Sequence, residues 1–130
     1  MSEATNLQNH LILAVQAKYP GSRLWRNNVG LAYPVTSFKR AWVFLCKGVI
    51  PAWFRPVKYG VVGSGDISGW LCIDGRAICT HIEVKVGKDK QSDEQRIFME
   101  IVRKYGGIYV VARSVDQALK ELDKATGRAR

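Results

Sequence analysis

Two carboxylates and a lysine, Asp66, Glu83 and Lys85, are spaced so that a β-hairpin would bring them together. Asp74-Gly75 separates two runs of β-forming residues, and an Asp-Gly pair tolerates the positive φ values of a two-residue turn. If this pair forms the whole turn, Asp66 lies directly opposite Glu83. Facing side chains lie on the same side of a sheet, with Cβ atoms about 5 Å apart. One divalent cation can bridge two carboxylates at that separation.

Alternation along the second run, residues 76–86, supports this register. It places Glu83 and Lys85 on the same side as Asp66, about 7 Å apart along the strand. Like charges that face each other destabilise a sheet, and a cation between the two carboxylates would relieve the repulsion. Gly69 is the weak point, because a glycine inside a strand can mark a bulge that shifts the register by one residue. The other alternate positions suit burial: Ile78, Thr80, Ile82, Val84 and Val86.

These residue types suit hydrolysis of a phosphodiester bond. The reaction needs charge stabilisation on the phosphate and an activated water, and a divalent cation supplies both. We expect Asp66 and Glu83 to hold Mg²⁺ or Mn²⁺, with the backbone carbonyl of Val84 as a third hard oxygen ligand. Lys85 would stabilise the phosphate or orient the water. Alternatively, Lys85 forms an ordinary surface ion pair with one of the two carboxylates.

Composition indicates a folded, basic protein. The chain has 130 residues, of which 47% are hydrophobic, and we expect one domain over residues 1–130. The net charge of +9 favours a polyanionic partner, most often nucleic acid. Three cysteines without a C-x-x-C spacing argue against a disulfide framework and against structural zinc. Without a membrane-spanning apolar run or a signal-peptide pattern, we expect a cytoplasmic protein.

Helical patterns lie on both sides of the hairpin. Residues 5–18 form an amphipathic pattern that Thr5 or Asn6 would cap. Ser92 starts a second helix, whose apolar stripe consists of Ile97, Phe98, Ile101, Val102 and Tyr105. The apolar run 108–112 predicts a buried strand, so this helix would be the crossover between two parallel strands.

Basic and amide side chains offer candidate contacts to DNA. Residues 23–28 predict a short strand that leads into a loop, and we expect its Trp25 in the core rather than as a stacking surface. Residues 38–59 interleave basic and aromatic side chains, which fits either a nucleic-acid surface or ordinary core with solvated lysines. The candidates for contacts to phosphate and sugar are Arg26, Asn27, Asn28, Lys88 and Lys90.

Several motifs, in chain order, resemble the stand-alone virus-type replication-repair nuclease (VRR-NUC) domain of the PD-(D/E)xK nuclease superfamily. The resemblance covers nearly the whole chain and implies an α/β fold with a restriction-endonuclease-like αβββαβ core, a mixed central sheet flanked by helices. Gly65 stands where the superfamily motif has proline. The motifs are Trp25-Arg26-Asn27-Asn28-Val29-Gly30, Gly63-Ser64-Gly65-Asp66-Ile67, Ile82-Glu83-Val84-Lys85, Ser92-x-x-Gln95 and Gly106-Gly107.

The resemblance also implies an activity. It implies a Mg²⁺- or Mn²⁺-dependent DNA endonuclease with Asp66, Glu83, Lys85 and Gln95 in the active site. Stand-alone members are similar to Holliday-junction resolvases, so it further implies a homodimer that acts on branched or four-way DNA.

Some alternatives stay open at this stage. Ser92-x-x-Gln95 is also a capping box, in which Gln95 would bond back to the backbone of Ser92. His81 shares a strand face with Glu83, and we expect it to be a bystander. The chain can also be a basic DNA-binding module that does not cleave, or a nuclease acting on RNA or, as a flap- or restriction-type enzyme, on unbranched DNA.

Overall fold

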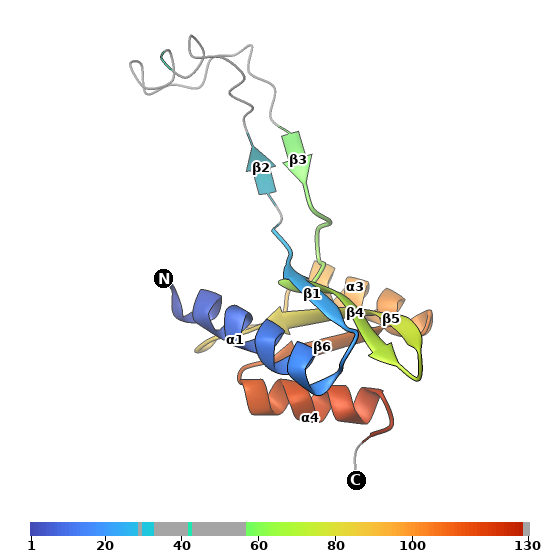
Figure 1. Ribbon diagram of the computed structural model, residues 1–130. Helices are drawn as coiled ribbons and strands as arrows, with labels where there is room; N and C mark the ends of the chain where they lie inside the picture. The colour runs from blue at the N-terminus through green and yellow to red at the C-terminus, as the bar shows by residue number, and fades with distance from the viewer. Residues whose placement is uncertain (29, 33–41, 43–56, 129–130) are drawn as a thin grey trace. The chain divides into compact units, whose positions relative to one another are not determined.

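The computed structural model describes residues 1–28, 30–32, 42 and 57–128 (Figure 1). The chain divides into two units, Met1–Asn27 with Val62–Arg130, and Asn28–Val61. In the second unit, β2 (Gly30–Ala32) pairs antiparallel with β3 (Val57–Tyr59). The interpretation of residues 38–59 falls almost entirely outside the described residues.

The first unit is built on a four-stranded sheet in the order β1-β4-β5-β6. β1, β4 and β5 are antiparallel neighbours, and β6 joins β5 in parallel. Helix α3 crosses over between β5 and β6, which confirms the predicted crossover, and the mixed sheet with flanking helices confirms the predicted fold class. The elements are α1 (Glu3–Lys18), β1 (Arg23–Arg26), β4 (Ile67–Ile73), β5 (Arg76–Val84), α3 (Asp93–Lys104), β6 (Ile108–Ala112) and α4 (Val115–Ala125).

The β4–β5 hairpin has the predicted register. Asp74 and Gly75 form the whole turn, with φ values of 50° and 74° that suit a two-residue hairpin loop. The pairing continues without interruption to the first residue of β4. Asp66 and Glu83 are therefore the facing positions that follow the last β4–β5 pair, Ile67 and Ile82.

Gly69 does not interrupt this register. It pairs with Thr80 in β5, so the bulge considered from the sequence is not formed. A Cβ at Gly69 would lie 2.0 Å from the carbonyl oxygen of Arg23. This glycine therefore allows β1 to lie close against β4.

The hydrophobic core lies on one face of the sheet, and α1 and α4 cover that face (Figure 1). Tyr19 and Lys18, at the end of α1, both bond the carboxylate of Asp123 in α4 at 2.5 Å. Each fully buried aliphatic side chain contributes roughly 1.5–3 kcal/mol. The core side chains include Leu11, Val15, Leu24, Ile67, Leu71, Ile82, Val84, Val110 and Leu122.

The cap predicted for the first helix is wrong. Helix α1 begins at Glu3, and Ser2 is its N-cap, with its side chain accepting a hydrogen bond from the Thr5 amide. The apolar pattern starts later than the helix, because the first turn is polar. Among the described residues, no helix is long and apolar enough to cross a membrane.

Helix α3 covers part of the other face of the sheet and packs on β6. Its Phe98 ring lies 4.9 Å from the ring of His81 and 6.2 Å from that of Tyr109. The predicted apolar stripe is only partly used, because Ile97 and Ile101 are 58% and 53% exposed. Helix α3 thus presents an apolar surface to solvent as well as to the sheet.

Trp25 is not a core residue, contrary to the expectation from the sequence. It is 50% exposed, whereas its neighbour Leu24 is 7% exposed and packs in the core. Successive residues of a strand point to opposite faces, so the burial of Leu24 places Trp25 on the face away from α1.

Candidate active site

The carboxylate of Glu83 is the centre of the site. Glu83 is only 2% exposed and lies on the sheet face that α3 partly covers. Its Oε1 accepts a hydrogen bond from Gln95 Nε2 at 2.5 Å and lies 3.0 Å from Lys85 Nζ. Its Oε2 lies 3.4 Å from the hydroxyl of Tyr109, which donates to it. The strand and the following helix thus converge on one buried carboxylate.

Asp66 is fixed beside Glu83 by the backbone. Its Oδ2 accepts a hydrogen bond from the Val84 amide at 2.8 Å, and its carbonyl accepts one from the Asn27 amide at 2.7 Å. A Cβ at Gly65 would lie 2.9 Å from the Ile82 carbonyl oxygen, so glycine lets this loop pack against β5. The position that is proline in the superfamily motif is therefore fitted to glycine here.

The Val84 carbonyl is directed toward the same side as Asp66. In an extended strand, the N–H and C=O of one residue point to the same side. The Val84 N–H points to Asp66, while the Lys85 N–H points the other way, to the Ala112 carbonyl of β6. The three oxygen groups predicted from the sequence, from Asp66, Glu83 and Val84, therefore lie around one end of β5.

Burial, and then repulsion from Asp66, raises the pKa of the Glu83 carboxyl above its ordinary value. Lys85 acts in the opposite direction but does not cancel the rise. A second positive charge near the two carboxylates would stabilise the ionised form of Glu83. This environment fits a divalent cation.

A cation here would need more than side-chain ligands. Within the part of the chain that the structure describes, no three His, Cys, Asp or Glu side chains form a metal-binding cluster. Two carboxylates, one backbone carbonyl and water are a donor set that suits Mg²⁺ or Mn²⁺, since these ions prefer oxygen and Mg²⁺ retains several waters. The residues present therefore fit a hard cation rather than zinc.

Gln95 serves the helix cap and the site at once. The Ser92 side chain accepts from the Gln95 amide at 3.2 Å, and Gln95 Oε1 accepts from the Ser92 amide at 2.8 Å, which completes a capping box. The same Oε1 accepts from Lys85 Nζ at 3.0 Å, while Nε2 donates to Glu83. The capping box is therefore formed, and it does not prevent the same side chain from contacting Lys85 and Glu83.

Tyr109 is a site neighbour that sequence reasoning missed. It is 1% exposed, and its hydroxyl lies 3.3 Å from the Gly63 carbonyl as well as near Glu83. Burial, and then the charge of Glu83, raises the pKa of Tyr109, so the hydroxyl keeps its proton and acts as a donor. The parallel register of β5 and β6 brings Tyr109 beside His81, and no sequence pattern specifies that register.

His81 packs beside the site. Its Nδ1 lies 3.0 Å from the Ser68 hydroxyl, and its ring stacks on Tyr109 with centroids 6.0 Å apart. Burial lowers the pKa of His81, which favours the neutral ring. These contacts make His81 a support for Tyr109 and Phe98.

The candidates for contacts to DNA take different positions. Asn27 bonds the side chain of Ser64 and, at 3.2 Å, the Gly65 carbonyl, so it braces the loop that carries Asp66. Arg26 is exposed at the end of β1 and donates to Gln8 at 2.9 Å. Asn28 is exposed and belongs to the second unit.

Lys88 and Lys90 are exposed in the turn that follows β5. Arg113, just after β6, donates to the carbonyls of Gly87 at 2.8 Å and Asp89 at 2.5 Å. Arg113 was not among the residues predicted to contact DNA. Its two bonds hold the backbone of this basic turn in place.

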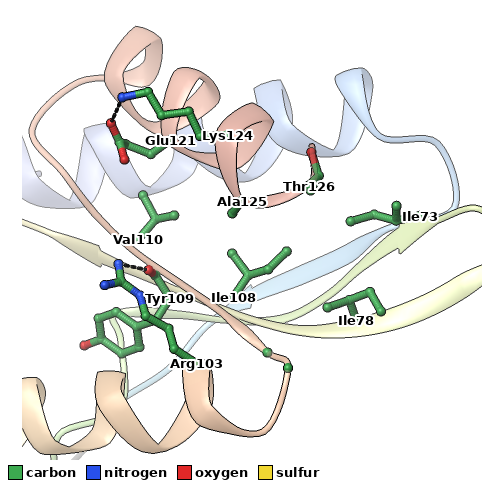
Figure 2. Close-up of a pocket in the computed structure, with 12 residues that line it drawn as sticks. Ile73, Ile78, Arg103, Ile108, Tyr109, Val110, Glu121, Lys124, Ala125 and Thr126 are labelled. Carbon is green, nitrogen blue, oxygen red and sulfur yellow. Dashed lines mark hydrogen bonds and ion pairs between the residues drawn. The ribbon is translucent and has the colours of Figure 1, made fainter. Parts of the chain in front are cut away.

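A hollow of about 650 Å³ lies elsewhere, lined by residues of the β4–β5 hairpin, α3, β6 and α4 (Figure 2). Figure 2 shows Arg103 bonding the Tyr109 carbonyl, at 2.8 Å, and the ion pair between Glu121 and Lys124. None of Asp66, Glu83, Lys85 and Gln95 lines it. Arg103 thus bonds a backbone carbonyl of β6, which is an edge strand of the sheet. Unpaired backbone groups on an edge strand otherwise favour pairing with another chain.

The fold thus brings together an aspartate before the hairpin, a Glu-x-Lys on its second strand and a glutamine on the next helix, which is the pattern of PD-(D/E)xK nucleases. The VRR-NUC domain model matches residues 4–116, and the chain belongs to this family. No curated protein and no solved structure matches the chain significantly. Nucleases of this type act on DNA and typically use divalent metal ions.

Replacing Gln95 by glutamate separates its two roles. Glutamate serves a capping box as well as glutamine does, but it cannot donate to Glu83 and brings a third carboxylate to the site. We expect Gln95→Glu to lower the free energy of unfolding of the metal-free protein by about 1–3 kcal/mol.

Gln117 is the matched control. It occupies the same helix position in α4. Its backbone N–H donates to the Ser114 hydroxyl, and its side-chain Oε1 accepts from the backbone N–H of Arg113 at 2.8 Å. Gln117→Glu should change stability by less than about 0.5 kcal/mol. Equal effects of the two substitutions in denaturant unfolding would show that Gln95 is a cap alone.

Proposed function

We propose that this chain is a Mg²⁺- or Mn²⁺-dependent DNA endonuclease whose metal ligands are Asp66, Glu83 and the Val84 carbonyl. The observation that supports this most is the burial of the Glu83 carboxylate beside Asp66, with a raised pKa. Such a pair is costly in the metal-free protein and favourable around a cation. The bound ion would polarise the phosphate and lower the pKa of a water molecule.

In this proposal Lys85 contacts the reacting phosphate or the attacking water. Its ammonium has three donors, of which two are directed at Glu83 and Gln95. The third is available to substrate, and the positive charge favours the phosphate as negative charge develops on it. Gln95 holds both Lys85 and Glu83, so it positions the two groups relative to each other.

The basic surface is proposed to guide DNA to this site. Lys88 and Lys90 lie in the turn directly after the strand that carries Glu83 and Lys85. Arg26 lies at the end of β1, next to the loop that carries Asp66. Contacts of this kind to phosphates make binding strongly dependent on salt concentration.

We further propose a homodimer that acts on branched DNA, with the four-way junction as preferred substrate. Resolution of a junction needs two matched nicks on opposing strands, and the described residues of each chain form one candidate site. A two-fold dimer supplies two sites and uses the same patch of each chain. The aromatic and aliphatic residues of segment 38–54 are one candidate for this patch, and they lie outside the described residues apart from position 42. The exposed apolar surface formed by Val62, Ile97 and Ile101 supports an interface on α3.

Cleavage should depend on the two carboxylates. We expect Asp66→Asn and Glu83→Gln to lower the cleavage rate by on the order of 10²-fold or more, while DNA binding is retained. Glu94→Gln, which changes an exposed carboxylate in the first turn of α3, is the control and should cleave normally.

The assay uses labelled linear, flapped and four-way DNA, with and without Mn²⁺, and labelled RNA as a competitor. Cleavage by the wild type that does not need a divalent cation would contradict the metal proposal. Binding without any cleavage would instead favour a DNA-binding module.

The dimer should depend on the α3 surface. Ile101→Lys places a charge on this surface and should convert a dimer to a monomer in light scattering, with loss of paired nicking of four-way DNA. Leu13→Lys is the control, since Leu13 is 66% exposed on α1. A wild-type monomer at micromolar concentration that cuts linear duplex as readily as a junction would contradict the proposal.

A further inference from the structure

We infer that Trp25 and Trp70 form a platform on which unpaired bases of a DNA substrate stack. The inference rests on the proposed function, because it places this tryptophan platform beside a DNA-cleaving site. It narrows the substrate to DNA in which base faces are open next to the bond that is cut, at a branch point, a flap or a single strand.

The two rings lie side by side at the surface. Trp25 is 50% exposed and Trp70 is 36% exposed. Their ring centroids are 5.9 Å apart and their planes meet at 71°, so the edge of one ring faces the other. The indole N–H of Trp70 donates to the Gly21 carbonyl at 3.2 Å, which fixes the orientation of that ring.

The platform lies on the same sheet face as the candidate site. Facing residues share a face, and Trp25 faces Ser68, which lies between Asp66 and Trp70 in the alternation of β4. Ser68 is about 7 Å and Trp70 about 13 Å along the strand from Asp66. A DNA strand with its phosphate at Glu83 therefore has neighbouring nucleotides within reach of both rings.

Helix α3 leaves this half of the face uncovered. It packs on β6, where Phe98 contacts His81 and Tyr109, while β1 forms the opposite edge of the sheet. Single exposed hydrophobic residues are common on protein surfaces. Here two indoles are adjacent, one of them is fixed by a hydrogen bond, and both lie on the face that carries the buried Glu83 and the half-buried Asp66.

Charge favours a nucleic acid as the occupant. Arg23 faces Trp70 across the strands and is exposed, and the chain carries a net charge of +9. Single-stranded DNA is bound by aromatic rings that stack on bases together with basic groups that track phosphates. In a duplex the faces of the bases are covered by their neighbours, so the platform selects flaps, branch points and single strands.

The test measures affinity rather than cleavage. Fluorescence anisotropy measures how the whole chain binds labelled oligothymidylate and a labelled blunt hairpin duplex. The buffer contains a metal chelator. We expect Trp25→Ala and Trp70→Ala to weaken single-strand binding by roughly 5- to 100-fold and to leave duplex binding unchanged. Trp25→Phe and Trp70→Phe, which keep a ring, should retain most of the affinity.

Tyr105→Ala is the matched control, because Tyr105 is an exposed aromatic residue on α3, 78% exposed. If an alanine variant does not fold, Trp25→Thr keeps β-propensity without a ring and takes its place. Unchanged single-strand affinity, or an equal loss for both DNAs, would overturn the inference. A fall in oligomeric mass would also overturn it and assign the two rings to an interface between copies.

Because no metal is present, the result does not depend on catalysis. Selective loss of single-strand binding supports the platform even if the protein proves unable to cleave. Normal cleavage with unchanged single-strand affinity refutes the platform and leaves the proposed nuclease intact.

Discussion

The burial of Glu83 beside Asp66 is the constraint on which the rest of the site depends. An ionised carboxylate loses hydration when it is buried, and a second carboxylate raises the cost further. The chain surrounds Glu83 with donors from Lys85, Gln95 and Tyr109, yet its pKa remains raised. Gln95 in the first turn of α3 and Tyr109 in β6 both contact this group, and the Tyr109 hydroxyl also contacts the Gly63 carbonyl in the loop before β4.

Much of this arrangement could be predicted from the sequence because it follows from local rules. The Asp74-Gly75 pair specifies a two-residue turn, and alternation along β5 then assigns Glu83 to one face and Ile82 to the other. A hairpin transmits its register from the turn, so one dipeptide is sufficient to place Asp66 opposite Glu83. The parallel crossover followed from a helix between two apolar runs.

The remaining features depend on tertiary contacts that a sequence pattern does not contain. Trp25 is of a residue type that is often buried, but Leu24 takes the core position. Gly69 lets β1 lie close against β4, which brings the exposed ring of Trp25 beside Trp70. Tyr109 lies in a run that is apolar throughout, and only the pairing of β6 with β5 brings its hydroxyl to Glu83. The partial exposure of the α3 stripe likewise depends on packing, in which Phe98 contacts His81 and Tyr109 while Ile97 and Ile101 remain exposed.

Thermal unfolding across pH, with and without Mn²⁺, tests the central claim most directly. Burial raises the pKa of the Glu83 carboxyl, so protonated Glu83 stabilises the folded protein most below the ordinary glutamate pKa. This contribution to the free energy of unfolding is lost as pH rises through the raised pKa of Glu83. Mn²⁺ binds the ionised form, so its stabilisation should grow over the same pH range, to about 2.7 kcal/mol at one hundred times Kd. Glu83→Gln should show neither the loss nor the gain. Equal stabilisation of both proteins by Mn²⁺, or parallel pH profiles, would contradict the account.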